Sequence, residues 1–146
     1  MFTEQMIERT AVMGLIPSSN HAANTDTSIA GINMNVIRRL LTYLDVGVLG
    51  TNANIQLYYQ ASATANMASP SNVAASIPIT AATANRLYLL EVRADQLPAG
   101  TSYVQPVIVV NANASFCGVV VVGDECAYKP GSNLTIANTV GAKVAT

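Results

Sequence analysis

Apolar and polar positions alternate along several segments of the chain with a period of two residues. Residues 54–60 are the clearest case, because Ile55, Leu57 and Tyr59 fall on one face of an extended segment. Residues 86–94 alternate in the same way. Alternation of this kind is typical of a strand with one buried face, so each segment is predicted to be a β-strand.

Two later segments, Ser102–Asn111 and Ser115–Val122, are apolar on both faces near their centres. Such strands are expected where both faces are covered, by the core on one side and by a second layer or a second protein on the other. The Asn-Ala-Asn-Ala sequence at residues 111–114 separates them, and we expect the two segments to pair as a hairpin.

The segment Asn33–Leu49 fits two patterns. As a strand, it places a set of apolar residues on one face, interrupted by Arg38 and Thr42: Met34, Val36, Leu40, Leu44, Val46 and Val48. The spacing of several of these residues also suits a helix. Asp45 and Gly47 disfavour a continued helix, and the strand-rich surroundings favour a strand.

The remaining segments have little periodicity. Ala61–Asn85 is rich in Ala, Ser, Thr and Asn and is predicted to be a long loop with one short strand at Ala75–Ile79. A weak strand is expected at Leu134–Ile136. Several short strands separated by turns, without a convincing amphipathic helix, predict an all-β fold: an antiparallel β-sandwich or jelly-roll-like single domain over residues 29–146.

Residues 1–28 have no sustained period, and a small, polar, turn-prone stretch follows the apolar patch Val12–Ile16. This composition predicts an extended N-terminal arm that becomes ordered on a partner subunit. The apolar residues expected to anchor the arm on that partner are Phe2, Met6, Ile7, Val12 and Ile16.

Charged residues are scarce. They make up 10% of the chain, against roughly 25% in an average soluble domain. Hydrophobic residues make up 51%, which excludes a disordered chain. Seven Lys and Arg against eight Asp and Glu provide no basic surface, so no nucleic-acid partner is expected. The apolar runs are shorter than the roughly 20 residues that cross a bilayer, so no membrane partner is expected.

The polar residues of the N-terminal sequence, Glu4, Glu8 and Arg9, predict that there is no secretory signal peptide and that the protein is assembled in the cytoplasm. The two cysteines, Cys117 and Cys126, are therefore expected to be reduced and buried. A disulfide across a hairpin is the alternative.

No catalytic, cofactor-binding or metal-binding motif occurs in the sequence, and His21 is the single histidine. We therefore expect that the protein is not an enzyme and has no cofactor. Tyr58 and Tyr59 favour packing in a sheet over a sugar-stacking platform. Asp124 and Glu125 favour a solvated hairpin tip over a carboxylate site.

Arg38 and Arg39 are adjacent, so a strand would direct one inward and the other outward. We expect the inward arginine to pair with Glu91 or Asp95. The functional alternative is that these arginines contact an acidic surface on a partner.

The Arg-Arg segment Asn35–Gly47, with its Asp-Val-Gly end, and the Glu-Val-Arg-Ala-Asp segment at residues 91–95 resemble a family of small proteins of tailed bacteriophages and prophages. The resemblance extends over about residues 30 to 125. Proteins of this family are usually encoded near the major capsid protein, and some resemble head decoration (cement) proteins with jelly-roll-like folds. This chain has Gln105-Pro106 where an arginine often follows the Tyr-Val pair, and the proline favours an edge position.

The resemblance implies a phage capsid decoration protein that binds the major capsid protein on the surface of the virion. It also implies a homo-oligomer, a dimer or a trimer, that matches the symmetry axes of the shell. The alternative is a structural module of a tail, a head fibre, or a receptor- or glycan-binding appendage.

Overall fold

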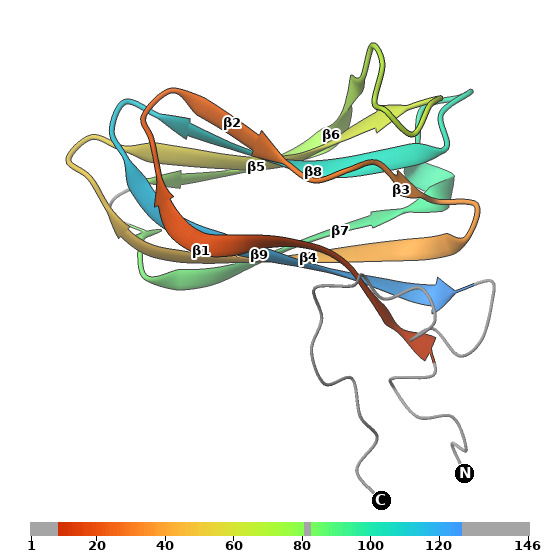
Figure 1. Ribbon diagram of the computed structural model, residues 1–146, viewed down its shortest axis with the longest axis horizontal. Helices are drawn as coiled ribbons and strands as arrows, with labels where there is room; N and C mark the ends of the chain where they lie inside the picture. Colours follow the sequence, from red (N-terminus) through yellow and green to blue (C-terminus); the bar gives the residue numbers. More distant parts are fainter. Residues whose placement is uncertain (1–8, 81–82, 127–146) are drawn as a thin grey trace, which may run out of the picture.

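The alternating segments form the strands of two antiparallel sheets in the computed structural model, which describes residues 9–80 and 83–126 (Figure 1). Sheet A has the strand order β1 (Ala11–His21), β9 (Ser115–Cys126), β4 (Ile37–Leu49), β7 (Arg86–Arg93). Sheet B has the order β2 (Thr25–Ser28), β8 (Tyr103–Asn111), β5 (Asn54–Ser62), β6 (Ser71–Thr80). The short β3 (Ile32–Asn33) also pairs with β8, and a 3-10 turn, η2 (Ala94–Gln96), follows β7.

Strand pairing follows a nested order. β1 pairs with β9, β2 and β3 pair with β8, β4 pairs with β7, and β5 pairs with β6. This is the pairing of one long hairpin folded back on itself, which curls so that β9 also pairs with β4 and β8 also pairs with β5. The result is a jelly roll, in which two sheets enclose one core. The predicted all-β antiparallel sandwich is confirmed.

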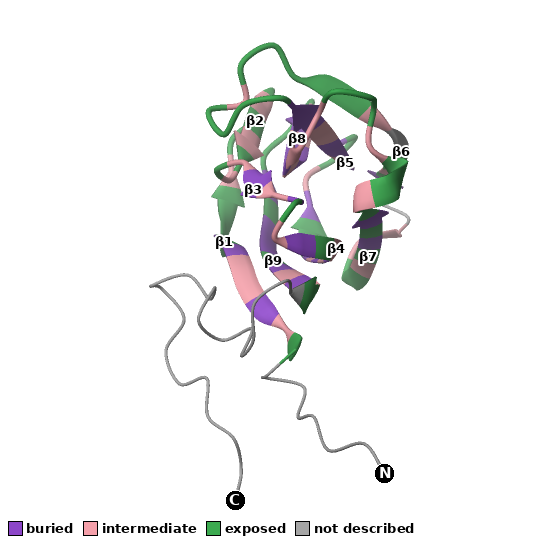
Figure 2. Cartoon of the chain, turned by 90° about the vertical axis from the view of Figure 1, so that its right-hand side faces the viewer, coloured by how far each residue is buried: buried purple, intermediate pink, exposed green. Residues whose placement is uncertain are grey.

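The core lies between the sheets and is built from the inward-facing residue of each alternating pair (Figure 2). Ile55, Leu57 and Tyr59 of β5 are fully buried, as their alternation predicts. Leu90 and Val92 of β7 also point inward. Most of the segment Asn33–Leu49, which fitted both a strand and a helix pattern, forms the strand β4.

One polar group of the core links the two sheets. Thr42, which interrupts the apolar face of β4, is fully buried, and its Oγ1 lies 2.6 Å from the hydroxyl oxygen of Tyr59. The Tyr59 hydroxyl donates to the carbonyl oxygen of Leu90 at 2.9 Å, so the Thr42 hydroxyl is the donor to Tyr59. Burial raises the pKa of Tyr59 far above its ordinary value. Each buried hydroxyl therefore has a partner.

The turns at one end of the sandwich explain part of the asparagine content. Asn24, Asn52 and Asn85 have positive φ angles of 55°, 60° and 56°. Asparagine tolerates this left-handed conformation better than most residues do. Asn24 Oδ1 also accepts a hydrogen bond from the backbone N–H of Ala112, which ties two of these turns together.

The predicted hairpin between residues 102–111 and 115–122 is wrong. β8 lies in sheet B and β9 lies in sheet A, so the link between them crosses from one sheet to the other. Both strands are central in their sheets: β9 pairs with β1 and β4, and β8 pairs with β2, β3 and β5. β9 also continues through Asp124 and Glu125, which the sequence placed at a hairpin tip.

The predicted long loop over Ala61–Asn85 contains a full strand, β6, that extends over ten residues. β6 pairs along β5 at the edge of sheet B. Among the residues of β6 whose burial is described, Ile79 alone is fully buried. An edge strand that buries so little has no strong alternation of apolar residues, so its composition resembles that of a loop.

The predicted arm over residues 1–28 does not hold for residues 11–28, which form β1 and β2 within the sandwich. Ala11 and Ile16 are buried in the core. The register of β1 against β9 shifts between Val12 and Gly14 and again between Ile16 and Ser19. These bulges interrupt the period of two residues, so the sequence pattern conceals the strand. Phe2, Met6, Ile7 and the predicted strand at residues 134–136 lie outside the described residues.

Replacing Tyr59 with Phe is expected to lower the free energy of unfolding by about 1–3 kcal/mol, because the buried Thr42 hydroxyl loses its partner. The matched control is Tyr58→Phe, since Tyr58 lies on the opposite face of the same strand and is half-buried. Urea denaturation of both variants measures the difference. An equal loss in both variants would show that the buried hydroxyl pair has no special role.

The thiol of Cys117 is buried in the core, and burial raises its pKa to about 11. Cys117 and Cys126 lie nine residues apart on the same strand, β9. A strand rises about 3.3 Å per residue, so their Cα atoms are about 30 Å apart, far beyond the roughly 7 Å that a disulfide can bridge. A disulfide within one chain is therefore excluded.

Dithiothreitol is accordingly expected to leave the melting temperature of the monomer unchanged. Alkylation of Cys117 at about pH 8 is expected to be slow until the protein unfolds, because the buried thiol is almost entirely protonated there. Peptide mass spectrometry separates Cys117 from Cys126. Rapid labelling of Cys117 in the native protein would contradict its burial.

Candidate interaction surface

The outward-facing residues of sheet A form rows that cross all four strands, and apolar side chains fill most positions. Read from β1 to β7, one row is Leu15, Val120, Tyr43 and Leu89. The adjacent row is Val12, Val122, Leu41 and Glu91. On the other side of the first row, a third row consists of Gly118, Asp45 and Leu87. Phe116 extends the surface further along β9.

Much of this surface is exposed to solvent. Exposed fractions of 38% to 55% are found for Leu15, Leu87, Leu89, Phe116 and Val120. We define the apolar face of sheet A as these residues together with Leu41, Tyr43 and Val122. Strands lie about 4.8 Å apart and rise about 3.3 Å per residue, so three rows on four strands, which include Glu91, Asp45 and Gly118, cover about 400 Å². A largely apolar surface of this size is often an interaction site.

One glycine keeps this face continuous. The bulged residue Ser18 of β1 lies directly over Gly118, where a Cβ atom would come within 2.9 Å of the Ser18 backbone nitrogen. A larger residue at this position would push β1 away from β9. The close approach of the two backbones therefore depends on the missing side chain.

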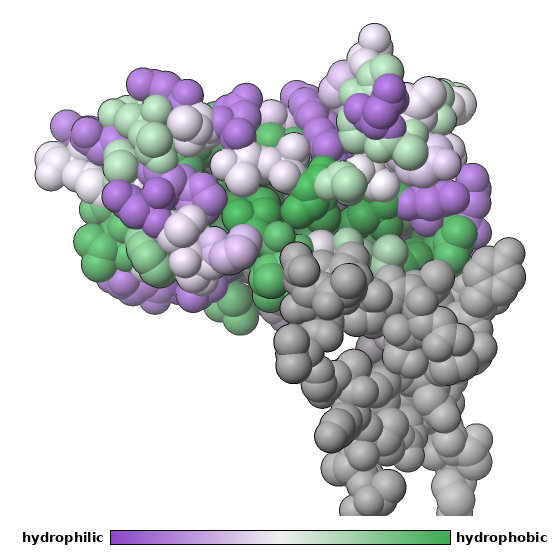
Figure 3. All heavy atoms as spheres, viewed as in Figure 1, coloured by the Kyte–Doolittle hydropathy of each residue, from purple (hydrophilic) through white to green (hydrophobic). Residues whose placement is uncertain are grey.

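The outer face of sheet B is more polar, although Val107 and Val109 of β8 also lie on it. Gln105, Gln60 and Asn72 form a ladder of side-chain hydrogen bonds across three strands, with distances of 3.1 and 3.3 Å. Asn111 donates to Asn54 in the same way at 2.9 Å. Figure 3 shows hydrophilic residues along the side of the molecule that sheet B forms. The two outer faces therefore differ in chemistry, and the apolar one is the candidate interface.

Charged residues gather at one end of sheet A. The register places Arg39 of β4 between Asp124 of β9 and Arg93 of β7. Arg9 makes two hydrogen bonds of 2.6 Å with the Asp124 carboxylate, and Arg93 lies 2.8 Å from Asp95. The hydrogen bonds from Arg9 are the main reason why the pKa of Asp124 is below its ordinary value. These charges border the apolar face on one side.

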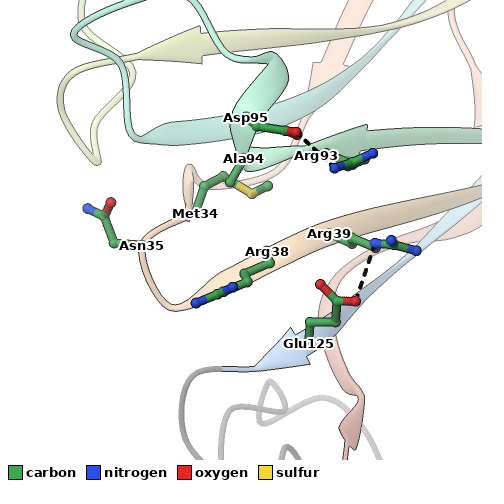
Figure 4. Close-up of a pocket in the computed structure, with 8 residues that line it drawn as sticks. All are labelled: Met34, Asn35, Arg38, Arg39, Arg93, Ala94, Asp95 and Glu125. Carbon is green, nitrogen blue, oxygen red and sulfur yellow. Dashed lines mark hydrogen bonds and ion pairs between the residues drawn. The ribbon is translucent and has the colours of Figure 1, made fainter.

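A shallow pocket of about 360 Å³ opens at this charged end (Figure 4). Its lining combines the β3–β4 turn, the start of β4, the end of β7 with η2, and the end of β9: Met34, Asn35, Arg38, Arg39, Arg93, Ala94, Asp95 and Glu125. Three arginines against two carboxylates leave one net positive charge, and each carboxylate forms an ion pair with one of the arginines. The pocket is therefore only weakly attractive to anions.

The structure places the two candidate arginines differently from the expectation. Arg39 pairs with Glu125 at 3.6 Å, so the predicted pairing with Glu91 or Asp95 is wrong. Arg38 is exposed, with no ion-pair partner among the described residues. Neither side chain enters the core, because both lie near the open end of β4. Contact with an acidic partner stays a prediction for both.

Other predicted contact residues separate in the structure. Ile16 is buried in the core of its own chain and is unavailable to a partner, whereas Val12 lies on the outer side of β1. Tyr58 and Tyr59 point to opposite faces of sheet B, so they form no shared stacking platform. The sequence pattern did not single out Leu15, Leu89 or Phe116, because an apolar residue on an outer face looks like any other strand residue.

His21 has a structural environment. Its Nε2 lies 3.2 Å from the carbonyl oxygen of Cys117, and its Nδ1 lies 3.4 Å from the hydroxyl of Thr27. A carbonyl only accepts, so the proton lies on Nε2 and Nδ1 accepts from Thr27. Within residues 9–80 and 83–126, no three His, Cys, Asp or Glu residues gather as metal ligands would. No helix in this part of the chain has the length and apolar character needed to cross a membrane.

No protein-family model matches the chain, and no curated protein matches its sequence. Solved structures do match its fold. The PBSX exported protein XepA matches with a TM-score of 0.56 and 13% identity, over 94% of this chain and 41% of XepA. This chain therefore corresponds to less than half the length of XepA.

Two further structures match with lower scores. PirA has a TM-score of 0.46 and 16% identity, over 83% of this chain and 98% of PirA. A chain of the disulfide-linked pili of Bacillus endospore appendages has a TM-score of 0.46 and 15% identity, over 87% of this chain and 99% of that chain. At these identities, the XepA match shows a shared fold.

The Arg9–Asp124 pair predicts a small dependence of stability on pH. The folded state lowers the pKa of Asp124, so its contribution is present above the ordinary aspartate pKa and is lost as the pH falls through the lowered value. Both side chains contact solvent, so Asp124→Asn is expected to reduce stability by less than about 1 kcal/mol near pH 7. The difference should vanish near pH 2.

Denaturation of the wild type and the variant at several pH values measures this effect. Asp45→Asn is the matched control, because Asp45 is exposed and makes no ion pair in the described part of the chain. A gap between Asp124→Asn and wild type that stays constant down to pH 2 would contradict the ion-pair explanation.

Proposed function

We propose that this chain is a structural protein of a tailed-phage or prophage particle, in which the apolar face of sheet A binds a neighbouring protein subunit. The observation that carries this proposal is the contrast between the apolar outer face of sheet A and the more polar outer face of sheet B. Apolar residues scattered singly over a surface are normal, but a largely apolar row across four strands is typical of an interaction site. In this proposal the protein is not an enzyme and has no cofactor.

The finer proposal is a head decoration protein that binds the major capsid protein on the virion surface after assembly in the host cytoplasm. A decoration protein stabilises a shell by adding contacts between neighbouring subunits, and repeated weak contacts on a symmetric lattice give strong retention. An apolar face of about 400 Å² suits a contact of this modest strength. Support also comes from the sequence resemblance over residues 30–125 and from the jelly roll, which occurs in viral capsid and lectin domains.

A second candidate is a tail, head-fibre or glycan-binding module. The feature that favours it is the amide ladder of Gln60, Asn72 and Gln105 beside the half-buried Tyr58 on sheet B. Amide groups and an aromatic ring are common contacts for sugars. Electron microscopy of particles that carry the labelled chain distinguishes the candidates, because decoration requires label across the head lattice and the second candidate requires it on an appendage.

Binding to particles is expected to withstand molar sodium chloride and to fail first in urea or guanidinium. Salt screens exposed charges but hardly weakens apolar burial. Val120→Lys, at the centre of the apolar face, should reduce the bound fraction strongly, whereas Gln56→Lys on the exposed face of sheet B should not. Sedimentation of particles with each variant gives the bound fraction.

Release by moderate salt, or equal loss of binding in both variants, would count against the apolar face as the contact. Circular dichroism of each free variant shows whether a loss of binding reflects unfolding instead.

A further inference from the structure

Besides the two-residue β3, four strands lie at the edges of the two sheets, and three of these four carry features that hinder pairing with another chain. β1 contains Pro17 and two bulges, β2 has four residues, and β6 contains Pro78 and a register shift beside Val73. Prolines, bulges and short length are the usual means by which proteins block a sheet edge. β7 has neither a proline nor a bulge along its eight residues.

The pairing of β4 with β7 shows which backbone groups of β7 lie at the open edge. The Tyr59 hydroxyl lies 2.9 Å from the carbonyl oxygen of Leu90 and 3.5 Å from that of Leu40, so both carbonyls lie between the two strands. In an antiparallel pair, successive residues direct their N–H and C=O groups alternately to the two sides. Leu87, Leu89 and Glu91 therefore direct theirs away from β4.

The end of the open edge supports this assignment. Arg93 belongs to the same alternating set as Leu87, Leu89 and Glu91. Its backbone N–H donates a hydrogen bond of 2.9 Å to Oε1 of Gln96 and not to β4. Gln96 thus closes the edge beyond Glu91. Between these limits, β4 is the only strand within residues 9–80 and 83–126 that pairs with β7. Within this open segment, the residues Leu87 and Leu89 are 55% and 50% exposed.

We propose that β7 pairs with β7 of a second copy of this chain, antiparallel and centred on Leu89. A two-fold axis at Leu89 places Leu89 opposite its own copy and Leu87 opposite Glu91 of the other copy, so residues with outward N–H groups face one another. No two like charges are directly opposite in this register. The two copies of sheet A then form one continuous sheet.

The blocked edges also fix the size of the assembly. After β7 has paired, the ends of the joined sheet are the two copies of β1, each with Pro17 and its bulges. Pairing through β7 therefore ends at a dimer and produces no fibre.

The dimer doubles the apolar face, and this consequence rests on the proposed function. One face covers about 400 Å², and two joined faces cover about 800 Å², which is the area that a standard interface buries on each partner. Edge pairing and face binding use different groups, since the first uses backbone groups of β7 and the second uses side chains of all four strands. Both can therefore occur in one assembly.

The first test is sedimentation velocity of the full chain from about 1 µM to about 100 µM. The mass is expected to rise from 15.2 kDa to twice that value as the concentration increases. Amide hydrogen exchange over the same range should show protection at Leu87, Leu89 and Glu91 that increases with concentration. Amides of Tyr88, Leu90 and Val92, which point to β4, should be protected at every concentration.

Three variants locate the contact. Leu89→Pro removes an outward N–H without removing a bond to β4, and Leu89→Lys places a charge opposite its own copy. Either change should weaken the dimer at least tenfold. Leu15→Lys is the matched control, because Leu15 occupies the same row of sheet A at the opposite, blocked edge. It should leave the dimer intact.

Several results would overturn the proposal. A full chain that stays monomeric at about 100 µM has no such dimer. Equal loss in Leu15→Lys and Leu89→Lys would indicate face-to-face packing, and protection of Leu89 that is independent of concentration would indicate a segment of the same chain on the edge. If Leu89→Pro does not fold, Leu89→Lys and hydrogen exchange still decide. A monomer that binds particles would reject the dimer and leave the proposed function intact.

Discussion

The position of β9 between β1 and β4 is the constraint on which the rest of the structure depends. A strand has two edges and two faces, and β9 uses all of them: its edges pair with the first described strand and with β4, and its inner face contributes Cys117, Val119 and Val121 to the core. Its partners lie far away in sequence, so the sandwich closes only when both ends of the described chain meet. Residues 11–21 therefore belong to the domain and not to an arm.

The same constraint explains why the sequence predicted the class of fold better than its connections. Alternation in residues 54–60 and 86–94 located β5 and β7, because each of these strands buries one face and exposes the other. Alternation carries no information on the partner of a strand. β8 and β9 follow one another in sequence and are apolar, so a hairpin was the simple prediction, although both strands pair only with other strands.

The missed elements share a physical cause. β1 contains two bulges, and β6 buries little, so in both strands the pattern of burial differs from a period of two residues. Thr42 shows the opposite problem: it interrupts an apolar face as a polar residue, yet it is buried because Tyr59 from the other sheet supplies its partner. A hydrogen bond between residues of two different sheets cannot be recognised from the local sequence pattern of either strand. The sequence indicated the apolar outer face of β9, but not the full apolar face of sheet A, since that face is assembled from four separate strands.

The scarcity of charged residues shapes the surface of both sheets. In most soluble domains, charged surface residues oppose association between molecules. In this chain only 10% of the residues are charged, and several of them lie together at one end of sheet A. The outer face of sheet B carries amide groups that bond to one another, and Asp26 is exposed on the same face. Sheet A has no such amide groups over its centre. The exposed leucines and valines on this face are the basis of the proposal that it contacts another protein subunit.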